Sequence, residues 1–567
     1  MLRTRIKASW PAGMVMSLVA AALFTLIQFA DVLVDSLTPR FGEKTPVSLR
    51  VPYGEVHNTS GYSASNIQHR YFVPIGTTLL QSEPAHRAAV AYEMQRRPVR
   101  PQTLLGAGAI FFTLCLSLTT YLRKFGQNRL KLLRTQTGLL GLLALLMLVA
   151  KGQLLFSQLS EFWIPLAMVP LWVSTAFDRR MAFVLTLVAS FAVAALLRFD
   201  LLFLVAMLTQ GMGAGLLVID RKHSRALLQA GVLAGCSAAG MLVAVLLTME
   251  ARFSLRADIW LGAGSRVLGC VGGGALAGVL AALLRAPAER LLGQVPRERL
   301  HDLTDLEQPL LKHMAQYAPG SWEHSRSMAN LAEQAASAIG VDALLVRVGA
   351  YYHDLGKSVR PKYFVENLSP GETSPHTTLT PYESAEVIRN HVVQGSQILR
   401  DGGIDEPVVE FAYTHHGTQL VEYFWNKHQE LGNEQGLTEE DFRYPGMKPQ
   451  TKETAILMLV DSIEAASRTV DPPERQQFEI MVQRVLFTKL GSGQLDESGL
   501  TMRDLNTIMN RMVDTLANMH HHRIKYPWQA RQAQQFGVPA RAVSDAPGAA
   551  DSAAAPTEAE PPASARH

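Results

Sequence analysis

The chain has few cysteines and little excess charge, and each shortage excludes a class of protein. Its 567 residues include only three cysteines, and all three lie inside apolar segments: Cys115, Cys236 and Cys270. A free thiol acts there as a small hydrophobic side chain, so neither a disulfide framework nor a cysteine zinc site is expected. The formal net charge is only +4, and the basic residues cluster at the ends of apolar segments instead of along one face. The sequence therefore gives no indication of nucleic-acid binding.

Acidic residues are almost missing from the apolar stretches of the first half of the chain, which is rich in Leu, Ala and Val. Because ionisable side chains within a membrane mark the path of an ion or a proton, their scarcity argues against an ion-coupled transporter. After about residue 290 the sequence has the mixed charge of a soluble domain. The chain is also too long for one ordinary core, so we expect at least two structural units.

Eight apolar stretches have roughly the length of membrane-spanning helices. The hydrocarbon core of a bilayer is about 30 Å thick and is crossed by about 20 helical residues. The first stretch follows Arg3, Arg5 and Lys7, as in a secretory signal peptide, but it lacks a small-residue cleavage site and is expected to remain as an anchor. We predict one span followed by a block of seven, over residues 14–33, 104–122, 136–156, 162–177, 181–197, 201–219, 226–248 and 261–284.

Basic residues in the short loops predict the orientation of these spans, because loops on the cytoplasmic side carry an excess of Lys and Arg. Five such residues lie in the loop 123–134. The alternate loops that follow hold five more: Arg179, Arg180, Arg221, Lys222 and Arg225. All these loops are expected on the cytoplasmic side, which places both termini and the polar second half of the chain in the cytoplasm.

The expected fold class is all-α, with an N-terminal polytopic helical membrane region followed by an all-helical cytoplasmic domain. In the second half, apolar residues recur at the three- and four-residue spacing of helices. The polar region between the first two spans is either a small sensor domain or a loosely ordered loop, and the Ala/Pro-rich tail is expected to be disordered. The predicted boundaries are 1–35 for an N-terminal stub with the first span, 36–102 for a short extracytoplasmic region, 103–285 for the seven-span block, 286–530 for the cytoplasmic domain and 531–567 for the tail.

Histidines are concentrated in the second half, with 12 of the 17 between residues 301 and 522. Some lie in polar or irregular surroundings or end a helical pattern, and we interpret them as surface or structural residues: His301, His313, His376, His428 and the run His520 to His522. Another set combines imidazole nitrogens with carboxylate oxygens, the ligand types that hold borderline divalent metals. It consists of His324, His353, Asp354, His391, His415, His416 and Asp461. Seven such side chains can hold two metal ions, because a carboxylate has two oxygens with which to bridge them.

The local sequence indicates that the pair His353 and Asp354 is buried. An apolar run that begins at Val346 leads into the pair, and Gly356 follows as a helix stop. A buried carboxylate without a cation is costly, so this Asp is expected to have a partner such as a metal ion. His415 and His416 follow a similar apolar run.

Longer stretches around these residues resemble one enzyme family. The HDLGK sequence at 353–357, together with the other histidines and Asp461 in this order, resembles the HD-domain phosphohydrolases. Four stretches are similar to the seven-transmembrane HD hydrolases of the PgpH type: RVGAYYHDLGK (347–357), HHGT (415–418), DFRYPGMKPQTKE (441–453) and RIKYP (523–527). The one-plus-seven pattern of spans agrees with that family. Gly417 is followed by Thr418, so the Gly-Tyr-Pro signature of the related enzymes that cleave cyclic di-GMP is absent.

The resemblance implies an activity and a ligand set. It implies a phosphodiesterase of the bacterial cytoplasmic (inner) membrane that hydrolyses cyclic di-AMP to linear pApA on the cytoplasmic side, with two divalent metal ions, iron or manganese. By matching positions, the first metal takes His324, His353, Asp354 and Asp461. The second takes the shared Asp354 with His391, His415 and His416. The region outside the membrane is much shorter here than in many relatives.

Two basic residues are candidates for contacts with the substrate phosphates. Lys357 lies one helical turn from Asp354, and we assign it to the catalytic centre with His353 and Asp354. Arg468 lies seven residues after Asp461, hence on the same face of a helix, and is assigned to substrate binding.

Two other functions stay open at this point. An HD phosphohydrolase that acts on another nucleotide, such as a nucleoside triphosphate or (p)ppGpp, needs one metal and four ligands, which leaves His391, His415 and His416 without a role. Alternatively, the membrane half acts as a receptor and the soluble half only binds a nucleotide. Membrane lipid is an expected partner in each case, and association into a homo-oligomer is left open.

Overall fold

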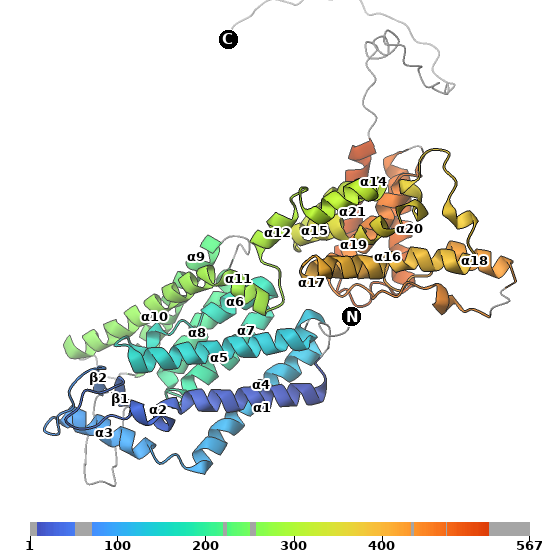
Figure 1. Cartoon of the computed structure of the whole chain (residues 1–567). Coiled ribbons are helices and arrows are strands. Elements are labelled where there is room, and N and C mark those ends of the chain that lie inside the picture. The colour runs from blue at the N-terminus through green and yellow to red at the C-terminus, as the bar shows by residue number, and fades with distance from the viewer. Residues whose placement is uncertain are drawn as a thin grey trace, which may run out of the picture.

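The chain is almost entirely helical in the part that the computed structural model describes, which is residues 8–51, 71–126, 128–218, 224–249, 257–432, 436–471 and 473–520. Figure 1 shows the blue-to-green first half and the yellow-to-red second half as two bodies that join through α11 (Arg285–Leu291) and α12 (Arg297–Leu303). The all-α fold class is confirmed. The predicted disordered tail, the stretch RIKYP, and His521 and His522 lie outside the described residues.

The first half is a bundle of apolar helices, several of which begin at a side-chain cap. Asp178 and Asp200 accept hydrogen bonds from the backbone NH groups of Met181 and Phe203, at 2.7 Å and 2.9 Å, and so begin α7 and α8. The helices of this bundle are α1 (Trp10–Gln28), α2 (Ala30–Leu33), α4 (Pro101–Phe125), α5 (Leu133–Phe156), α6 (Met168–Ala176), α7 (Arg179–Ala195), α8 (Leu201–Leu217), α9 (Ser224–Met249) and α10 (Ala257–Leu283).

Five of these helices are long and apolar enough to cross a membrane by themselves, namely α1, α4, α5, and the larger part of α9 and of α10. The stretch 162–177, predicted as a span, instead divides into a 3-10 turn, η3 (Glu161–Trp163), and α6, with Pro165 between them. Nine residues of α-helix cover only about 14 Å, less than the apolar core of a bilayer. That three further segments cross, in α6, α7 and α8, therefore stays a prediction.

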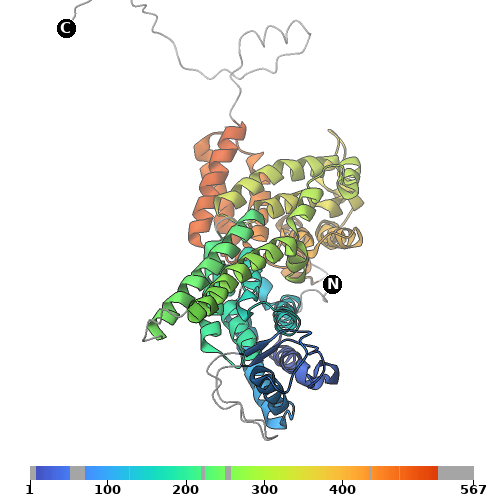
Figure 2. The same ribbon diagram turned by 90° about the vertical axis from the view of Figure 1, so that its left-hand side faces the viewer.

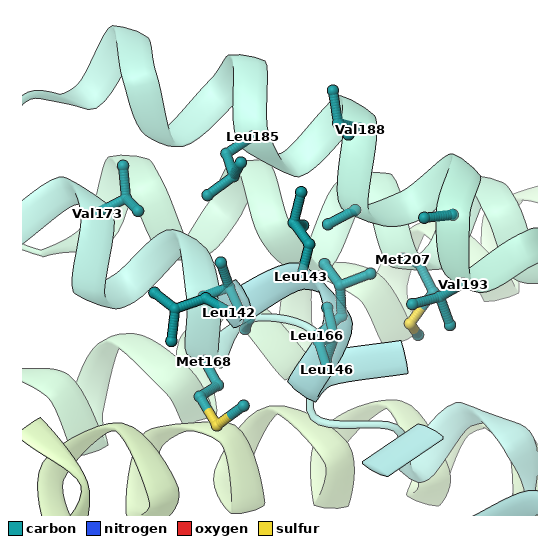
Figure 3. Close-up of a cluster of buried hydrophobic side chains, with 14 of the residues drawn as sticks. Leu142, Leu143, Leu146, Leu166, Met168, Val173, Leu185, Val188, Val193 and Met207 are labelled. Carbon is teal, nitrogen blue, oxygen red and sulfur yellow. The ribbon is translucent and has the colours of Figure 1, made fainter. Parts of the chain in front are cut away.

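Side chains from four consecutive helices form the centre of the bundle. Leu142 and Leu146 of α5 lie among Met168 of α6, Leu185 of α7 and Met207 of α8, and all five are buried (Figure 3). By contrast, α9 and α10 approach each other through glycines: a Cβ atom on Gly274 would lie 2.5 Å from the carbonyl oxygen of Gly231. Small residues at a contact let membrane helices pack backbone against backbone.

The region between the first two spans contains a small packed unit. An antiparallel pair, β1 (Leu49–Val51) and β2 (Tyr71–Val73), packs against α3 (Pro84–Arg96) around a core that reaches Leu155 at the end of α5. Figures 1 and 2 show this unit at the end of the bundle that points away from the second half. Of the two alternatives for this region, the described residues therefore favour a small folded unit over a loop.

A network of buried charges ties this unit to the membrane helices. Lys151 Nζ of α5 lies 2.6 Å from Asp31 Oδ1 of α2, and Arg96 of α3 is 3.1 Å from both Asp31 and Glu93. Charges removed from water are stabilising only when they are paired, so each member of this network requires the others.

We predict that Lys151→Met destabilises the chain, because it leaves Asp31 buried with one cation fewer. Breaking a buried ion pair costs about 3–5 kcal/mol, so the thermal unfolding midpoint of the full chain in detergent should fall by several degrees. Arg40→Met, at an exposed position, should leave the midpoint unchanged. Combining Lys151→Met with Asp31→Asn should recover most of the loss. A midpoint unaffected by Lys151→Met alone would contradict a stabilising role for this network.

The second half is a helical domain built around α19 (Lys452–Ser467), whose residues 455–460 are all fully buried. Helices α14, α15, α17 and α20 pack around it. The other helices are α13 (Pro309–Tyr317), α14 (Pro319–Ala338), α15 (Ala343–Tyr352), α16 (Pro381–Asp401), α17 (Glu406–Thr414), α18 (Glu422–Glu430), α20 (Arg475–Gly491) and α21 (Met502–His520). Short 3-10 segments connect them, among them η4 (Leu355–Val359), which follows α15.

The basic loop between α4 and α5 contacts this domain directly. The side chain of Asn128 donates hydrogen bonds to the carbonyl oxygens of Gln450, at 3.3 Å, and Glu497, at 2.6 Å, and Arg129 lies 3.7 Å from Glu410 on α17. The loop that the charge pattern predicts to be cytoplasmic thus lies at the same end of the bundle as the second half of the chain. This position agrees with the prediction that the loop and the second half of the chain lie on the same side of the membrane.

Candidate metal centre

The structure brings together all seven of the predicted metal ligands, which are spread over almost 140 residues of sequence. They come from five helices whose ends or faces meet in the interior of the domain. His324 belongs to α14, His353 and Asp354 follow α15, His391 belongs to α16, His415 and His416 follow α17, and Asp461 belongs to α19.

The carboxylate of Asp354 lies between two groups of histidines. Its Oδ2 atom is 3.2 Å from Nε2 of His353. Its Oδ1 atom is 3.5 Å from Nε2 of His391 and 3.6 Å from Nε2 of His415. One oxygen therefore points to each side, which is the arrangement that a carboxylate bridging two ions requires.

On each side of Asp354, three further side chains can offer one ligand atom each, with these atoms all within 4.8 Å of one another. The first group is His324, His353 and Asp461, and the second is His391, His415 and His416. This division matches the two ligand sets that the sequence resemblance implies.

Backbone carbonyl groups fix the orientation of three of the rings. Nδ1 of His353 lies 2.9 Å from the carbonyl oxygen of Ala350, Nδ1 of His391 lies 2.5 Å from that of Ile388, and Nδ1 of His415 lies 3.1 Å from that of Phe411. A carbonyl oxygen can only accept, so each Nδ1 must carry the proton and donate it. The Nε2 atoms that point into the centre then have free lone pairs, as metal ligation requires.

Two atoms at the middle of the centre lack the hydrogen bonds that buried polar groups normally make. His353 Nε2 and Asp354 Oδ1 are buried, and neither has a hydrogen-bond partner within the part of the chain that the structure describes. Because an unsatisfied buried polar atom costs free energy, atoms of this kind mark the place of a missing partner. Nitrogen and carboxylate oxygen donors together suit iron, manganese or zinc, so the residues present fit a divalent metal.

The electrostatics of the centre favour the protonation states that bind metal. Burial raises the pKa of the Asp354 carboxyl, but its interactions with the His353 ring and the Lys357 ammonium group outweigh this and hold its pKa well below the usual range. Burial lowers the pKa of His391 to about 3, so this imidazole is neutral near pH 7. An ionised carboxylate and a neutral imidazole are both ready to donate an electron pair to a metal ion.

His324 differs from the other rings because carboxylates flank both of its nitrogens. Nε2 lies 3.0 Å from Asp461 Oδ1, and Nδ1 lies 2.6 Å from Oε2 of Glu464. Burial lowers the pKa of His324, but these two hydrogen bonds outweigh it and raise the pKa to about 10. A metal ion that binds Nε2 must therefore displace a proton from this ring.

Two family models match the chain, and between them they cover both halves. Residues 101–291 match the model described as a 7TM receptor with intracellular HD hydrolase, and residues 321–466 match the HD domain. The chain carries an HD domain behind a 7TM-type membrane region. The family resemblance that the motifs indicate is thereby confirmed, and the chain is a membrane protein.

Two curated relatives are enzymes named cyclic-di-AMP phosphodiesterase PgpH. That of Bacillus subtilis is 43% identical over 229 residues, which are 40% of this chain and 32% of the relative. That of Listeria monocytogenes is 40% identical over 239 residues, 42% of this chain and 33% of the relative. The match thus spans about one third of the length of these relatives. The crystal structure of the Listeria PgpH HD domain in complex with cyclic di-AMP is 40% identical and covers 39% of this chain and all of that one, with a TM-score of 0.37.

The glycine of the HDLGK stretch is not the helix stop that the sequence predicts, because α15 ends at Tyr352 and Gly356 lies inside η4. In the HD domain, Gly356 lies against α16, where a Cβ atom would overlap the carbonyl oxygen of His391. On the facing helix, a Cβ atom on Gly395 would come within 3.0 Å of the backbone nitrogen of Gly356. The two glycines let η4 and α16 touch backbone to backbone, and this contact brings Asp354 close to His391.

Lys357, a predicted substrate contact, lies within the centre and pairs with two carboxylates. Its Nζ atom is 2.8 Å from Asp354 Oδ2 and 2.9 Å from Glu366 Oε1. Burial lowers the pKa of Lys357, but these two carboxylates outweigh it and raise the pKa above its ordinary value, so the ammonium group is charged. Contact between Lys357 and a phosphate stays a prediction.

Arg468, the other predicted substrate contact, is bound to a carboxylate of its own helix. Its Nε and Nη2 atoms donate hydrogen bonds to Oε1 of Glu464 at 3.0 Å and 2.7 Å. Half of the Arg468 side chain is exposed, whereas Glu464 is buried. Its assignment to substrate binding is likewise untested by this geometry.

Sequence reasoning missed two residues of the centre. Glu464 follows Asp461 by three residues, and this spacing on a helix was the available signal for a second carboxylate on the same face. Tyr444 lies in the DFRYPG stretch, and its ring stacks on His416 with centroids 4.3 Å apart and an interplanar angle of 27°. Stacking on a ring from another segment is a tertiary contact, which a local sequence pattern does not predict.

We predict that Gly356→Ala disrupts the metal centre. The added methyl group must push η4 away from α16, which moves Asp354 relative to His391 by more than a ligand geometry tolerates. The purified full chain should retain fewer than two metal ions, measured by elemental analysis, and should unfold at a lower temperature. Gly491→Ala, whose Cβ atom would meet nothing within 4 Å, is the matched control and should change neither quantity. Unchanged metal content in Gly356→Ala would disprove the claim that this backbone contact sets the ligand geometry.

Proposed function

We propose that this chain is a membrane-anchored phosphodiesterase that hydrolyses cyclic di-AMP to linear pApA at a centre of two metal ions. The observation that carries the proposal is the position of Asp354, whose two oxygens face two separate groups of histidines. The printed activity of the two PgpH relatives supports the choice of substrate. Because these relatives are matched over only about a third of their length, the activity of the whole chain rests on this proposal.

The proposed ligand sets are His324, His353, Asp354 and Asp461 for one ion, and Asp354, His391, His415 and His416 for the other, with iron or manganese as the metal. Bound together, two such ions supply an acidified water and neutralise charge on the phosphoryl oxygens. Asp354 holds the two ligand groups at a fixed separation. The Nδ1 hydrogen bonds of the histidines keep their rings in the ligating orientation.

Lys357 contributes a fixed positive charge beside the reacting phosphate. Its ammonium group lies next to Asp354 and keeps its proton there, so it can donate a hydrogen bond to a phosphoryl oxygen that enters the centre. Hydrolysis of the phosphodiester would form a bond from the water oxygen to phosphorus and break the bond to the ribose 3′ oxygen, which would leave as a hydroxyl group with a proton from that water. Arg468, whose side chain is half exposed, is positioned to meet the second phosphate on the same face of α19.

The site is proposed to face the cytoplasm of a bacterial cell from its cytoplasmic (inner) membrane. The basic loop that contains Asn128 and Arg129 contacts the HD domain, and the small unit of β1, β2 and α3 lies at the opposite end of the bundle. Loops rich in Lys and Arg remain on the cytoplasmic side. This arrangement lets an event outside the cell act on a hydrolase inside it.

We predict that Asp354→Ala removes both metal ions and all turnover. The change deletes the one carboxylate that both ligand groups share, so each set loses a ligand. Metal content by elemental analysis should fall from two ions per chain, and cyclic di-AMP hydrolysis should become undetectable. Asp302→Ala, an exposed carboxylate of the same domain, is the control and should behave as the unmodified chain. Full metal content with undiminished hydrolysis in Asp354→Ala would refute the assignment.

The substrate is tested by product analysis of the full chain with manganese, or with iron in the absence of oxygen. We predict that cyclic di-AMP yields pApA faster than cyclic di-GMP yields its linear product, and that nucleoside triphosphates and (p)ppGpp are not cleaved. A one-metal HD hydrolase would act on the last two and would not need His391, His415 and His416. The assembled second group argues against that alternative, and preferential cleavage of (p)ppGpp would overturn the proposal.

A further inference from the structure

One histidine ligand of the HD domain is oriented differently from three of the others. His353, His391 and His415 each donate their Nδ1 proton to a backbone carbonyl oxygen near them in sequence. These contacts form with any side chain at the accepting residue. His324 instead meets the side chain of Glu464 on another helix, at 2.6 Å. Its orientation therefore depends on a residue that substitution can remove.

Glu464 is itself held by a second residue of α19. Both hydrogen bonds from Arg468 go to Oε1, which leaves Oε2 to accept from His324. Glu464 is 5% exposed. A buried carboxylate is costly unless it is paired and hydrogen-bonded, and here its two oxygens have one cationic and one imidazole partner. The three residues form a chain that runs from the surface to the metal centre.

A carboxylate behind a ligating histidine has two effects. It selects the tautomer in which Nδ1 carries the proton and Nε2 is free to bind metal, and it increases the basicity of the ring. Removing such a partner commonly lowers metal affinity by about 10- to 100-fold. Asp461 lies on the other side of the ring, 3.0 Å from Nε2. Without Glu464, Nδ1 loses the acceptor that fixes its proton, so the ring can turn or take the tautomer in which Nε2 carries the proton and donates it to Asp461.

We propose that Glu464 is a positioning residue for His324 and that Arg468 acts through it, so that this pair sets the affinity of the first metal site. The inference rests on the proposed two-metal function and deepens it. It gives Arg468 a role in holding Glu464, distinct from its predicted contact with substrate. It also makes the two metal sites unequal, because the Nδ1 atoms of His391 and His415 in the second site meet backbone carbonyl groups, whereas Nδ1 of His324 in the first meets a side chain.

The test measures metal binding directly on the full chain in detergent. After removal of metal with a chelator, manganese is titrated back and followed by calorimetry and by electron paramagnetic resonance, which reports the coupled signal of two neighbouring ions. Glu464→Ala should weaken one of the two binding events by about 10- to 100-fold and leave the other unchanged. Glu464→Gln, whose amide oxygen still accepts from Nδ1, should weaken it less, and Glu453→Gln elsewhere on α19 should have no effect.

Activity separates positioning from a merely structural role. Turnover of Glu464→Ala should recover toward that of the unmodified chain at saturating manganese, because the ligands themselves remain. Arg468→Gln should shift the same binding event in the same direction, by a smaller factor. Wild-type affinity at both sites in Glu464→Ala overturns the proposal. A raised KM with unchanged manganese affinity in Arg468→Gln overturns the part assigned to Arg468.

The unfolding curve of Glu464→Ala, and the metal binding and activity of the unmodified chain, separate a failure to fold and a wrong substrate from a wrong positioning role. If Glu464→Ala fails to fold, by its thermal unfolding curve without metal, the decision passes to Glu464→Gln and Arg468→Gln, for which unchanged manganese affinity overturns the proposal. The unmodified chain distinguishes the two levels of inference. If it binds two ions but does not cleave cyclic di-AMP, the proposed substrate fails while the positioning role is still decided by affinity. If it binds only one ion, the two-metal function itself fails.

Discussion

The burial of one carboxylate constrains the rest of the HD domain. Asp354 is 1% exposed, and its charge is tolerable only because imidazoles and an ammonium group surround it. To reach it, histidines must come from α15, α16 and α17, and these helices can converge only where their backbones approach closely. Gly356 and Gly395 permit that approach. The all-apolar segment of α19 then packs beneath the converging ends and carries Asp461 into the same space.

The two ends of the membrane half are held by different kinds of contact. At one end, buried charges join α2, α3 and α5, so the small unit outside the spans cannot move without exposing or separating them. At the other end, Asn128 and Arg129 meet the HD domain through polar contacts. Interfaces of this kind are the ones expected to rearrange. A movement of the bundle helices is therefore expected to rearrange the contacts at the HD-domain end before it separates the buried charges at the outer end.

Much of the centre could be predicted from the sequence, because ligation depends on residue type and order. His and Asp side chains next to apolar runs predict buried donors, and the motifs that surround them identify the HD domain. What could not be predicted depends on contacts between distant segments. Glu464 meets His324 only because α14 lies beside α19, and Tyr444 stacks on His416 only because its loop folds over that ring. The stretch 162–177 has the apolar composition of a span, yet it divides at Pro165, where the ring removes a backbone donor.

The two ligand groups differ in how they are held, and this difference has a physical consequence. In the second group, His391 and His415 are oriented by carbonyl oxygens of their own helices, so these rings stay in place as long as α16 and α17 stay folded. In the first group, His324 and Asp461 come from α14 and α19, and the hydrogen bond to Glu464 spans the same two helices. Any shift of α14 against α19 therefore changes the distance between His324 and Asp461. The same shift loosens the hydrogen bond that orients the His324 ring. Both sites depend on packing between helices, but in the first the orientation of one ligand ring depends on that packing as well.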